Sequence, residues 1–144
     1  MKIAIASDHA GFRLKRILKE HFSEYEFIDV GTDSEDSCDY PDYAVLACEK
    51  VISGEADFGI VICGTGIGVS IAANKVKGIR AALCFNEFMA DMSRRHNNAN
   101  VLSLGAKVID NDLAIRITDI WLKSEFEGRR HERRLQKIVK IELL

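Results

Sequence analysis

Short apolar segments of strand length alternate with segments of helical spacing along almost all of the 144 residues. Apolar strands that alternate with helices imply a parallel sheet with helices on both of its faces. The predicted strands are 2–6, 25–30, 57–63, 80–84 and 100–104, and the predicted helices are 11–22, 41–54, 69–76, 86–96, 110–122 and 129–142. The alternation therefore constrains the fold class to α/β.

The right-handed crossover rule makes an open, doubly wound sheet the leading architecture, because a closed eight-stranded barrel needs about 200 residues or more. We predict a single-domain three-layer αβα sandwich over residues 1–144, with a five-stranded parallel sheet in the Rossmann-like order 2-1-3-4-5 and an extra C-terminal helix. In such sheets ligands bind at the carboxyl ends of the strands. Polar and reactive residues gather there, at 7–9, 31–32, 63–68, 84–86 and 105–107.

The overall charge is nearly balanced but unevenly placed. Lys and Arg number 20 against 22 Asp and Glu, which argues against a nucleic-acid partner. No stretch approaches the roughly 20 apolar residues of a membrane span, so we expect no membrane partner. The start of the chain shows no export signal, so we expect a cytoplasmic location. Residues 128–144 contain six Lys or Arg and two Glu, which indicates a local anion site or a partner contact.

A glycine-rich loop, Cys63-Gly-Thr-Gly-Ile-Gly68, follows the third predicted strand. It matches neither nucleotide motif fully, because no lysine follows it and Val69 stands where the dinucleotide motif has its third glycine. Such a loop can be simply a tight strand-to-helix turn. Alternatively, its backbone N–H groups converge at a helix N-terminus and stabilise negative charge. That position would favour the thiolate form of Cys63.

The four cysteines are widely spaced, which excludes the C-x-x-C pattern of zinc and redox sites. A buried, unreactive thiol is the commonest state of a single cysteine, and we assign it to Cys38, Cys48 and Cys84 because no glycine loop follows them. Cys63 is the exception. Oxidative regulation through Cys63 is a weaker alternative, since no resolving cysteine lies nearby in the sequence.

Two further groups could carry chemistry. His96 ends the fourth predicted helix, which we expect to place it close to the functional edge, although it could equally serve that helix as a C-terminal cap. In the basic tail, Arg130 and Arg134 share a helix face, as do Arg129 and Arg133, and either pair could hold a phosphate. A solvated basic helix is the alternative. His21 and His131 are predicted to be solvated surface residues.

Six motifs in register resemble one family. They are Asp8-His9-x-Gly11, Asp39-Tyr40-Pro41-x-Tyr43-Ala44, the loop 63–68 with Ser70 to Lys75, Gly78-Ile-Arg80-Ala, His96-Asn-x-x-Asn100-Val and Gly128-x-Arg130-His131-x-x-Arg134. The chain resembles type B ribose-5-phosphate isomerase, of the family that includes galactose-6-phosphate isomerase subunits. This resemblance covers nearly the whole chain.

The resemblance implies interconversion of ribose 5-phosphate and ribulose 5-phosphate in the pentose phosphate pathway, without a metal or an organic cofactor. It implies that Cys63 is the base, that His96 donates the proton that opens the sugar ring, and that Asp8 and Thr65 assist in catalysis. The implied substrate-binding residues are Asp8, His9, Tyr40, Gly64, Thr65, Gly66, Ile67, Gly68, Asn97, Lys107, Arg130 and Arg134. Among these, His9, Arg130 and Arg134 would hold the phosphate.

Two positions depart from the family's pattern. Lys107 stands where the family often has an arginine that reaches a neighbouring subunit's site, and lysine lacks the forked geometry of arginine. Arg129 replaces a common glycine. Because strand ends alone make a shallow cleft, we expect a homodimer, or a dimer of dimers, with shared active sites.

Other functions remain open at this point. The substrate could be a six-carbon phosphate such as allose 6-phosphate or galactose 6-phosphate. The chain could instead be a non-catalytic sensor of a sugar phosphate or a nucleotide. The isomerase fits the chemistry best, because moving a proton next to a carbonyl needs a base, a cradle for the enediolate and a remote binding handle.

Overall fold

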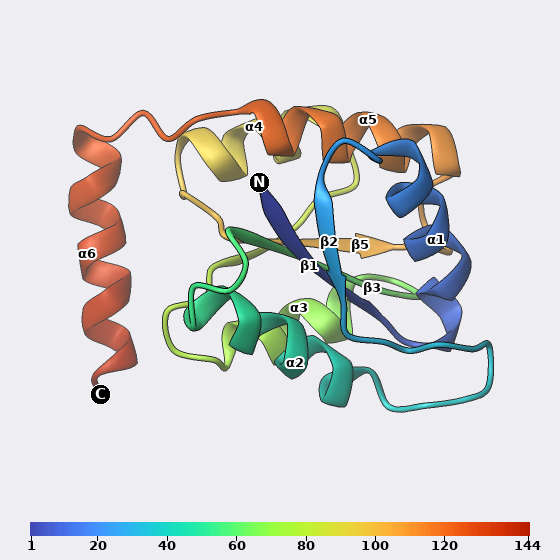
Figure 1. Ribbon diagram of the computed structural model, residues 1–144. Helices are drawn as coiled ribbons and strands as arrows, with labels where there is room; N and C mark the ends of the chain where they lie inside the picture. Colours follow the sequence, from blue (N-terminus) through green and yellow to red (C-terminus); the bar gives the residue numbers. More distant parts are fainter.

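A five-stranded parallel sheet forms the centre of the protein, in a computed structural model that describes residues 1–144 (Figure 1). The strands are β1 (Lys2–Ser7), β2 (Glu26–Asp29), β3 (Phe58–Cys63), β4 (Ala81–Leu83) and β5 (Val101–Gly105). The helices are α1 (Phe12–His21), α2 (Tyr40–Ile52), α3 (Ile67–Asn74), α4 (Glu87–Arg95), α5 (Asn111–Lys123) and α6 (Arg130–Glu142), and a short 3-10 turn, His9–Gly11, precedes α1. All predicted elements are confirmed, with boundaries that differ by a few residues.

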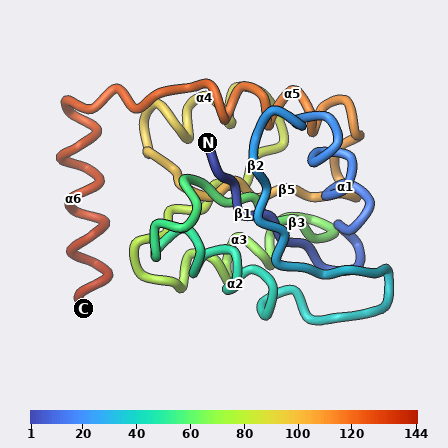
Figure 2. Tube along the Cα trace, viewed as in Figure 1, coloured from blue at the N-terminus to red at the C-terminus, as the bar shows by residue number.

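The helices form two layers and one outlier. α2 and α3 cover one face of the sheet, and α1, α4 and α5 cover the other (Figure 1). The backbone trace in Figure 2 shows that α6 stands beside the sandwich, at the end of an extended segment that leaves α5. The extra C-terminal helix is therefore confirmed. No helix has the length and apolar character needed to cross a membrane.

The strand order is β2-β1-β3-β5-β4, so the predicted order 2-1-3-4-5 is wrong for the last two strands. β5 pairs with β3 and is buried along its whole length, whereas the three residues of β4 are half-buried at the sheet edge. After β3 the chain passes the position of β5 and forms β4 at the sheet edge. It then returns to form β5 between β3 and β4. A return with the usual right-handed crossover puts its connecting helix on the opposite face, and α4 accordingly packs against α5.

The two faces of the sheet carry side chains of different size. Toward α1, α4 and α5 the strands point large side chains such as Ile5, Ile60 and Leu102, which pack with the fully buried Trp121. Toward α2 and α3 they point smaller ones, including Ala4 and Ala6. The small residues allow α2 and α3 to approach the sheet closely, which fixes the start of α3 against the end of β3.

A buried ion pair ties α1 to β2. The ammonium of Lys15 is 1% exposed and donates to Asp29 Oδ1 at 2.8 Å, while Lys19 donates to Oδ2 at 2.9 Å. Partial burial alone would raise the pKa of Asp29, but hydrogen bonds from Lys15, Lys19 and the Gly31 N–H outweigh it and lower that pKa. The carboxylate is therefore a stabilising partner for a buried cation.

Asp29→Asn should lower the free energy of unfolding at neutral pH by about 3 kcal/mol, because it leaves the buried Lys15 ammonium without its counter-charge. The stabilisation exists above the unfolded pKa of the carboxyl group and is lost as the pH falls through the lower folded pKa. Urea unfolding at neutral pH and near pH 3 measures how much free energy of unfolding Asp29→Asn removes at each pH. The exposed Asp33→Asn is the control. An equal loss at the two pH values would contradict this assignment.

Candidate active site

The carboxyl ends of β1 and β3 open into a cavity of about 510 Å³. Nine of the predicted site residues line this cavity, together with Ala10 and Ile71; the nine are Asp8, His9, Tyr40, Cys63, Gly64, Thr65, Ile67, Gly68 and Lys107. They come from separate segments of the chain and meet because parallel strands end at the same edge. We call this group the carboxyl-edge cluster. It joins a thiol, a carboxylate, an imidazole and an amine in one place.

Cys63 ends β3 at the floor of this cavity and is 5% exposed. Its Sγ accepts a hydrogen bond from the backbone N–H of Gly66 at 3.2 Å. The loop can fold back in this way because Gly66 has a φ of +79°, and a Cβ there would lie 2.8 Å from the backbone of Leu104. Ser103 fixes the loop from below by donating to the Gly66 carbonyl at 2.6 Å.

The N–H groups of the loop are only partly available to a ligand. The N–H of Gly66 donates to the sulfur and that of Ile67 to Thr65 Oγ1 at 3.2 Å, whereas the N–H groups of Gly64, Thr65 and Gly68 have no hydrogen-bond partner within the protein. The first turn of α3 still directs its positive end toward the cavity. Tyr40 packs directly over Gly68, where a Cβ would lie 2.6 Å from its ring. The oxyanion cradle is thus narrower than the loop sequence predicts.

Asp8 and His9 are held by backbone groups. Asp8 Oδ1 accepts from the N–H of Ala10 at 3.0 Å and of Gly11 at 3.2 Å, so the side chain caps the 3-10 turn. His9 Nδ1 accepts from the N–H of Cys38 at 3.2 Å. An accepting Nδ1 leaves the proton of the neutral ring on Nε2, where it can be donated to an anion.

The cysteines fall into two groups. Cys48 and Cys84 are buried, as predicted, and burial raises the pKa of their thiols to about 12 and about 11. The prediction for Cys38 is wrong, because this residue is half-exposed and its Sγ lies 4.0 Å from His9 Nδ1. It belongs to the loop before α2, which folds over the cavity wall instead of entering the core.

His96 and Asn97 do not line the cavity that contains Cys63. They follow α4, which runs back along the sheet, so they lie at the amino ends of the strands. Val101 pairs with Gly59 and Gly105 pairs with Cys63, so most of the length of β3, about 13 Å at ~3.3 Å per residue, separates the two edges. The expectation that His96 lies close to the carboxyl edge is therefore wrong.

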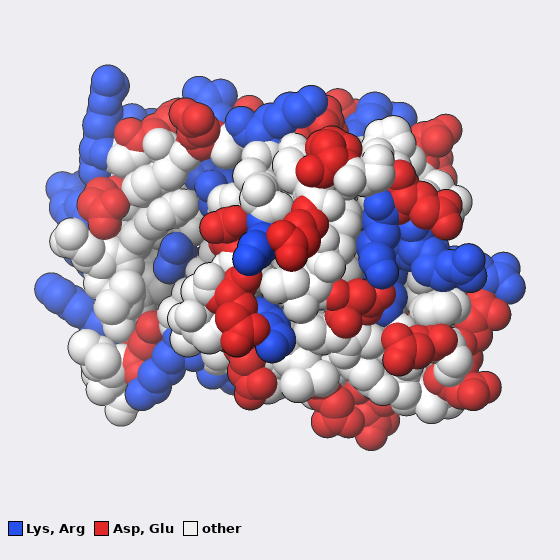
Figure 3. Space-filling model, in the orientation of Figure 1, with Lys and Arg blue, Asp and Glu red and all other residues white.

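The two tail arginines also lie away from Cys63. Arg130 begins α6 and lines a cavity of about 330 Å³ with Glu127, Gly128, Arg129 and His131, and Arg134 is exposed one turn later. Figure 3 shows blue side chains along the outer border on the α6 side, in agreement with the basic tail of the sequence. We call His96, Asn97, Arg130 and Arg134 the amino-edge cluster.

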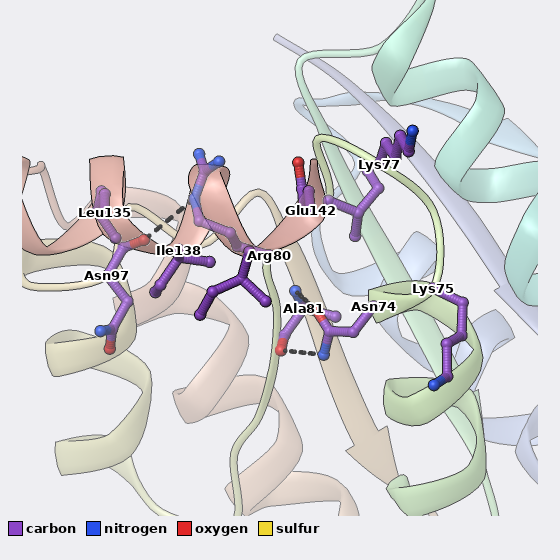
Figure 4. Close-up of a pocket in the computed structure, with 11 residues that line it drawn as sticks. Asn74, Lys75, Lys77, Arg80, Ala81, Asn97, Leu135, Ile138 and Glu142 are labelled. Carbon is purple, nitrogen blue, oxygen red and sulfur yellow. Dashed lines mark hydrogen bonds between the residues drawn. The ribbon is translucent and has the colours of Figure 1, made fainter. Parts of the chain in front are cut away.

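Asn97 also borders a larger cavity of about 560 Å³ that lies between α6 and the body of the protein. In Figure 4, Leu135, Ile138 and Glu142 of α6 lie along one side of it, with Asn74 at the end of α3 and the following Lys75 across from them. Arg80 donates to the carbonyl of Asn97 at 3.2 Å and holds the loop after α4 in place. Most of the apolar residues of α6 remain exposed, among them Ile138, Val139 and Ile141.

His131 is 5% exposed, so its prediction as a solvated surface residue is wrong. The first turn of α6 folds inward, and the His131 ring stacks on that of His96 with 4.1 Å between centroids. Burial, with the nearby His96, lowers the pKa of His131. Glu127 approaches His96 Nε2 at 3.6 Å and accepts from Arg95 at 3.1 Å. The only sequence signal for this contact is the spacing of four residues between Glu127 and His131.

Arg129 precedes α6 with φ +56° and ψ −126°, a region that favours glycine. Arg129→Gly should raise the free energy of unfolding by about 1 kcal/mol, because glycine adopts this conformation without steric cost. Thermal unfolding measures the change, with the exposed Arg133→Gly inside α6 as a control that should instead destabilise. Equal losses for both variants would show that this backbone is not strained.

Comparison with known proteins agrees with this geometry. A family model described as Ribose/Galactose Isomerase matches residues 3–138. Ribose-5-phosphate isomerase B of Escherichia coli is 48% identical over 143 residues, covering 98% of this chain and 96% of that protein. A structure of Clostridium thermocellum ribose-5-phosphate isomerase B superposes with a TM-score of 0.98 at 56% identity, covering 99% of this chain and 98% of that one. The Mycoplasma genitalium ribose-5-phosphate isomerase B, solved with bound ribulose-5-phosphate, superposes with a TM-score of 0.93 at 46% identity, covering 99% of this chain and 96% of that one.

Proposed function

The chain belongs to the Ribose/Galactose Isomerase family, and from this premise we propose that it interconverts ribose 5-phosphate and ribulose 5-phosphate with Cys63 as the base. The observation that carries the proposal is the Cys63 thiol on the cavity floor, with the Gly66 N–H donating to its sulfur. A donor aimed at sulfur stabilises its negative charge. The thiolate is then available as a base beside a bound sugar.

The reaction moves two protons and needs no outside oxidant or reductant. The Cys63 thiolate removes the proton from C2 of the open-chain aldose, the electron pair forms the C1=C2 bond of an enediolate, and the thiol returns the proton to C1. A second proton passes from O2 to O1. The Gly68 N–H and the positive end of α3 stabilise the charge that develops on these oxygens, and Thr65 and Asp8 lie at the same cavity wall.

The substrate phosphate supplies binding energy away from the reacting carbons. His9 is one part of its site, with the proton of the neutral ring on the free Nε2. Arg130 and Arg134 would complete it, because guanidinium groups match phosphate oxygens, and His96 would donate the proton that opens the furanose ring. Those three residues belong to the amino-edge cluster, which one chain holds at the wrong end of its sheet.

A second copy of the chain resolves this separation. In a two-fold symmetric dimer, the amino-edge cluster of each protomer faces the carboxyl-edge cluster of its partner, and two complete sites form at once. The exposed apolar side chains of α6, such as Ile138 and Ile141, provide a surface that such a partner would bury. We therefore propose a homodimer with shared active sites, in which Lys107 and Asn97 contact the same substrate from opposite protomers.

The function is tested by incubating the purified protein with ribose 5-phosphate in the presence of EDTA and following ketose formation. We expect turnover in both directions and no loss with EDTA, since none of the proposed steps uses a metal ion. A parallel assay with allose 6-phosphate and galactose 6-phosphate measures the preference for chain length. Binding of ribose 5-phosphate without any turnover would favour a sensor and overturn the proposal.

A further inference from the structure

Three metal-ligating side chains converge at the junction between α4 and α6. His96 is the C-cap of α4, His131 lies in the first turn of α6, and Glu127 lies in the segment that precedes it. One ligand atom from each lies within 4.8 Å of the others. Glu127 Oε1 is 3.6 Å from His96 Nε2 and 4.0 Å from His131 Nε2. The three groups therefore point toward a common position.

An independent observation concerns His131. Its Nε2 is buried without a hydrogen-bond partner in the structure, and its side chain is 6% exposed. Buried polar atoms almost always have a partner, so this nitrogen lacks the one that its position requires. Glu127 Oε1, at 4.0 Å, lies beyond hydrogen-bond distance. The nitrogen faces the same position as His96 Nε2 and the carboxylate.

We propose that His96, Glu127 and His131 bind one divalent transition-metal ion of the Zn²⁺ and Co²⁺ class. Two imidazoles and one carboxylate suit these borderline cations, whereas Mg²⁺ and Ca²⁺ require mostly oxygen ligands. Metal–ligand bonds of roughly 2.0–2.2 Å require the three side chains to close slightly around the ion. The rings are now nearly parallel, 11° apart, so the His96 ring, whose side chain is 34% exposed, must tilt to aim its lone pair.

The surrounding charges shape this site. Arg95 occupies the other oxygen of Glu127, and Arg130 lines the adjoining cavity. The positive charges of these arginines repel a metal cation, so coordinate bonds to nitrogen must supply most of the affinity for the ion. This requirement strengthens the preference for nitrogen-binding cations over Mg²⁺.

Metal binding should inhibit the enzyme, and this part of the inference rests on the proposed function. In the proposed mechanism His96 donates the proton that opens the sugar ring, and a ring nitrogen that ligates a metal ion has no proton to give. The site is thus an inhibitory one, and the proposed reaction does not require the ion. Removal of the ion by EDTA should restore full activity.

The test is a titration of the intact, tag-free protein with Co²⁺, followed by visible ligand-field absorption. We expect one ion per chain in the wild type and in His21→Gln, which removes a histidine remote from the site. His131→Gln and Glu127→Gln should weaken Co²⁺ binding at least about tenfold. Because His131 is buried, circular dichroism should accompany its variant, and the surface residue Glu127 provides a second variant that should not disturb folding.

Binding is measured without turnover, so its outcome does not depend on the isomerase proposal. Absence of Co²⁺ binding, or binding that survives both substitutions, overturns the site. A second arm measures inhibition of ketose formation by Zn²⁺ and its reversal by EDTA. Co²⁺ binding with undiminished turnover would overturn the inhibitory role, while absence of turnover in the metal-free protein would count against the proposed function alone.

Discussion

Cys63→Ala should reduce kcat for ribose 5-phosphate by about 10²–10⁴-fold while leaving the KM nearly unchanged, because general-base catalysis contributes an effect of this size and the phosphate contacts remain. Cys63→Ser should behave in the same way, since a hydroxyl group is a far weaker base than a thiolate. Cys63 borders the cavity, and neither alanine nor serine is larger than cysteine, so neither change should unfold the protein.

Cys48→Ala is the matched control. Its thiol is fully buried on the inner face of α2, with a pKa raised by burial to about 12, so it stays protonated and cannot act as a base at neutral pH. Its replacement should cost some stability but leave kcat unchanged. The measurement is initial-rate kinetics on each folded variant. A Cys63→Ala enzyme that retains turnover within tenfold of the wild type would assign the base to another group.

Mixing two inactive variants should restore about a quarter of the wild-type activity. If each site joins the carboxyl-edge cluster of one chain to the amino-edge cluster of its partner, Cys63→Ala and His96→Gln damage opposite halves. When chains exchange at random, about half of the dimers are mixed, and each of these has one intact site of two. Activity is measured before mixing and after the chains have been unfolded and refolded together.

A second mixture serves as the control for this experiment. Cys63→Ala and His9→Gln both damage the carboxyl-edge cluster, so every site in their mixed dimers contains one damaged half. This mixture should stay inactive under the same exchange conditions. Recovery in neither mixture would place the complete machinery within one chain. Recovery in both would show that Cys63 and His9 do not belong to the same half of a site.

The alternation of strands and helices was sufficient to predict the elements and the layers. It was not sufficient for the order of β4 and β5, because neighbours in sequence usually pair in the sheet and only burial distinguishes the two strands. β5 is buried throughout, while β4 is a short edge strand. The order of β4 and β5 depends on which face of the sheet α4 packs against, and tertiary contacts decide that face.

The candidate site was predicted in part for a related reason. Residues that follow strands directly, such as Asp8 and Cys63, meet at the carboxyl edge because the topology requires it. His96 follows a helix, and a helix that crosses back delivers its end to the opposite edge. The burial of His131 depends on how the segment between α5 and α6 places the start of α6 against the body of the protein. Residue spacing alone does not define that path.

The placement of His96 and Cys63 at opposite ends of the strands also has a consequence for measurements at low protein concentration. Folding of one chain buries both sheet faces, and if the site is shared as proposed, no single chain completes one, so dissociation would leave chains that are still folded but inert. Dilution below the dissociation constant of the dimer should then lower the specific activity before any loss of secondary structure, by mass action. Catalysis in such a molecule reports on assembly, while spectroscopic stability reports on the single chain.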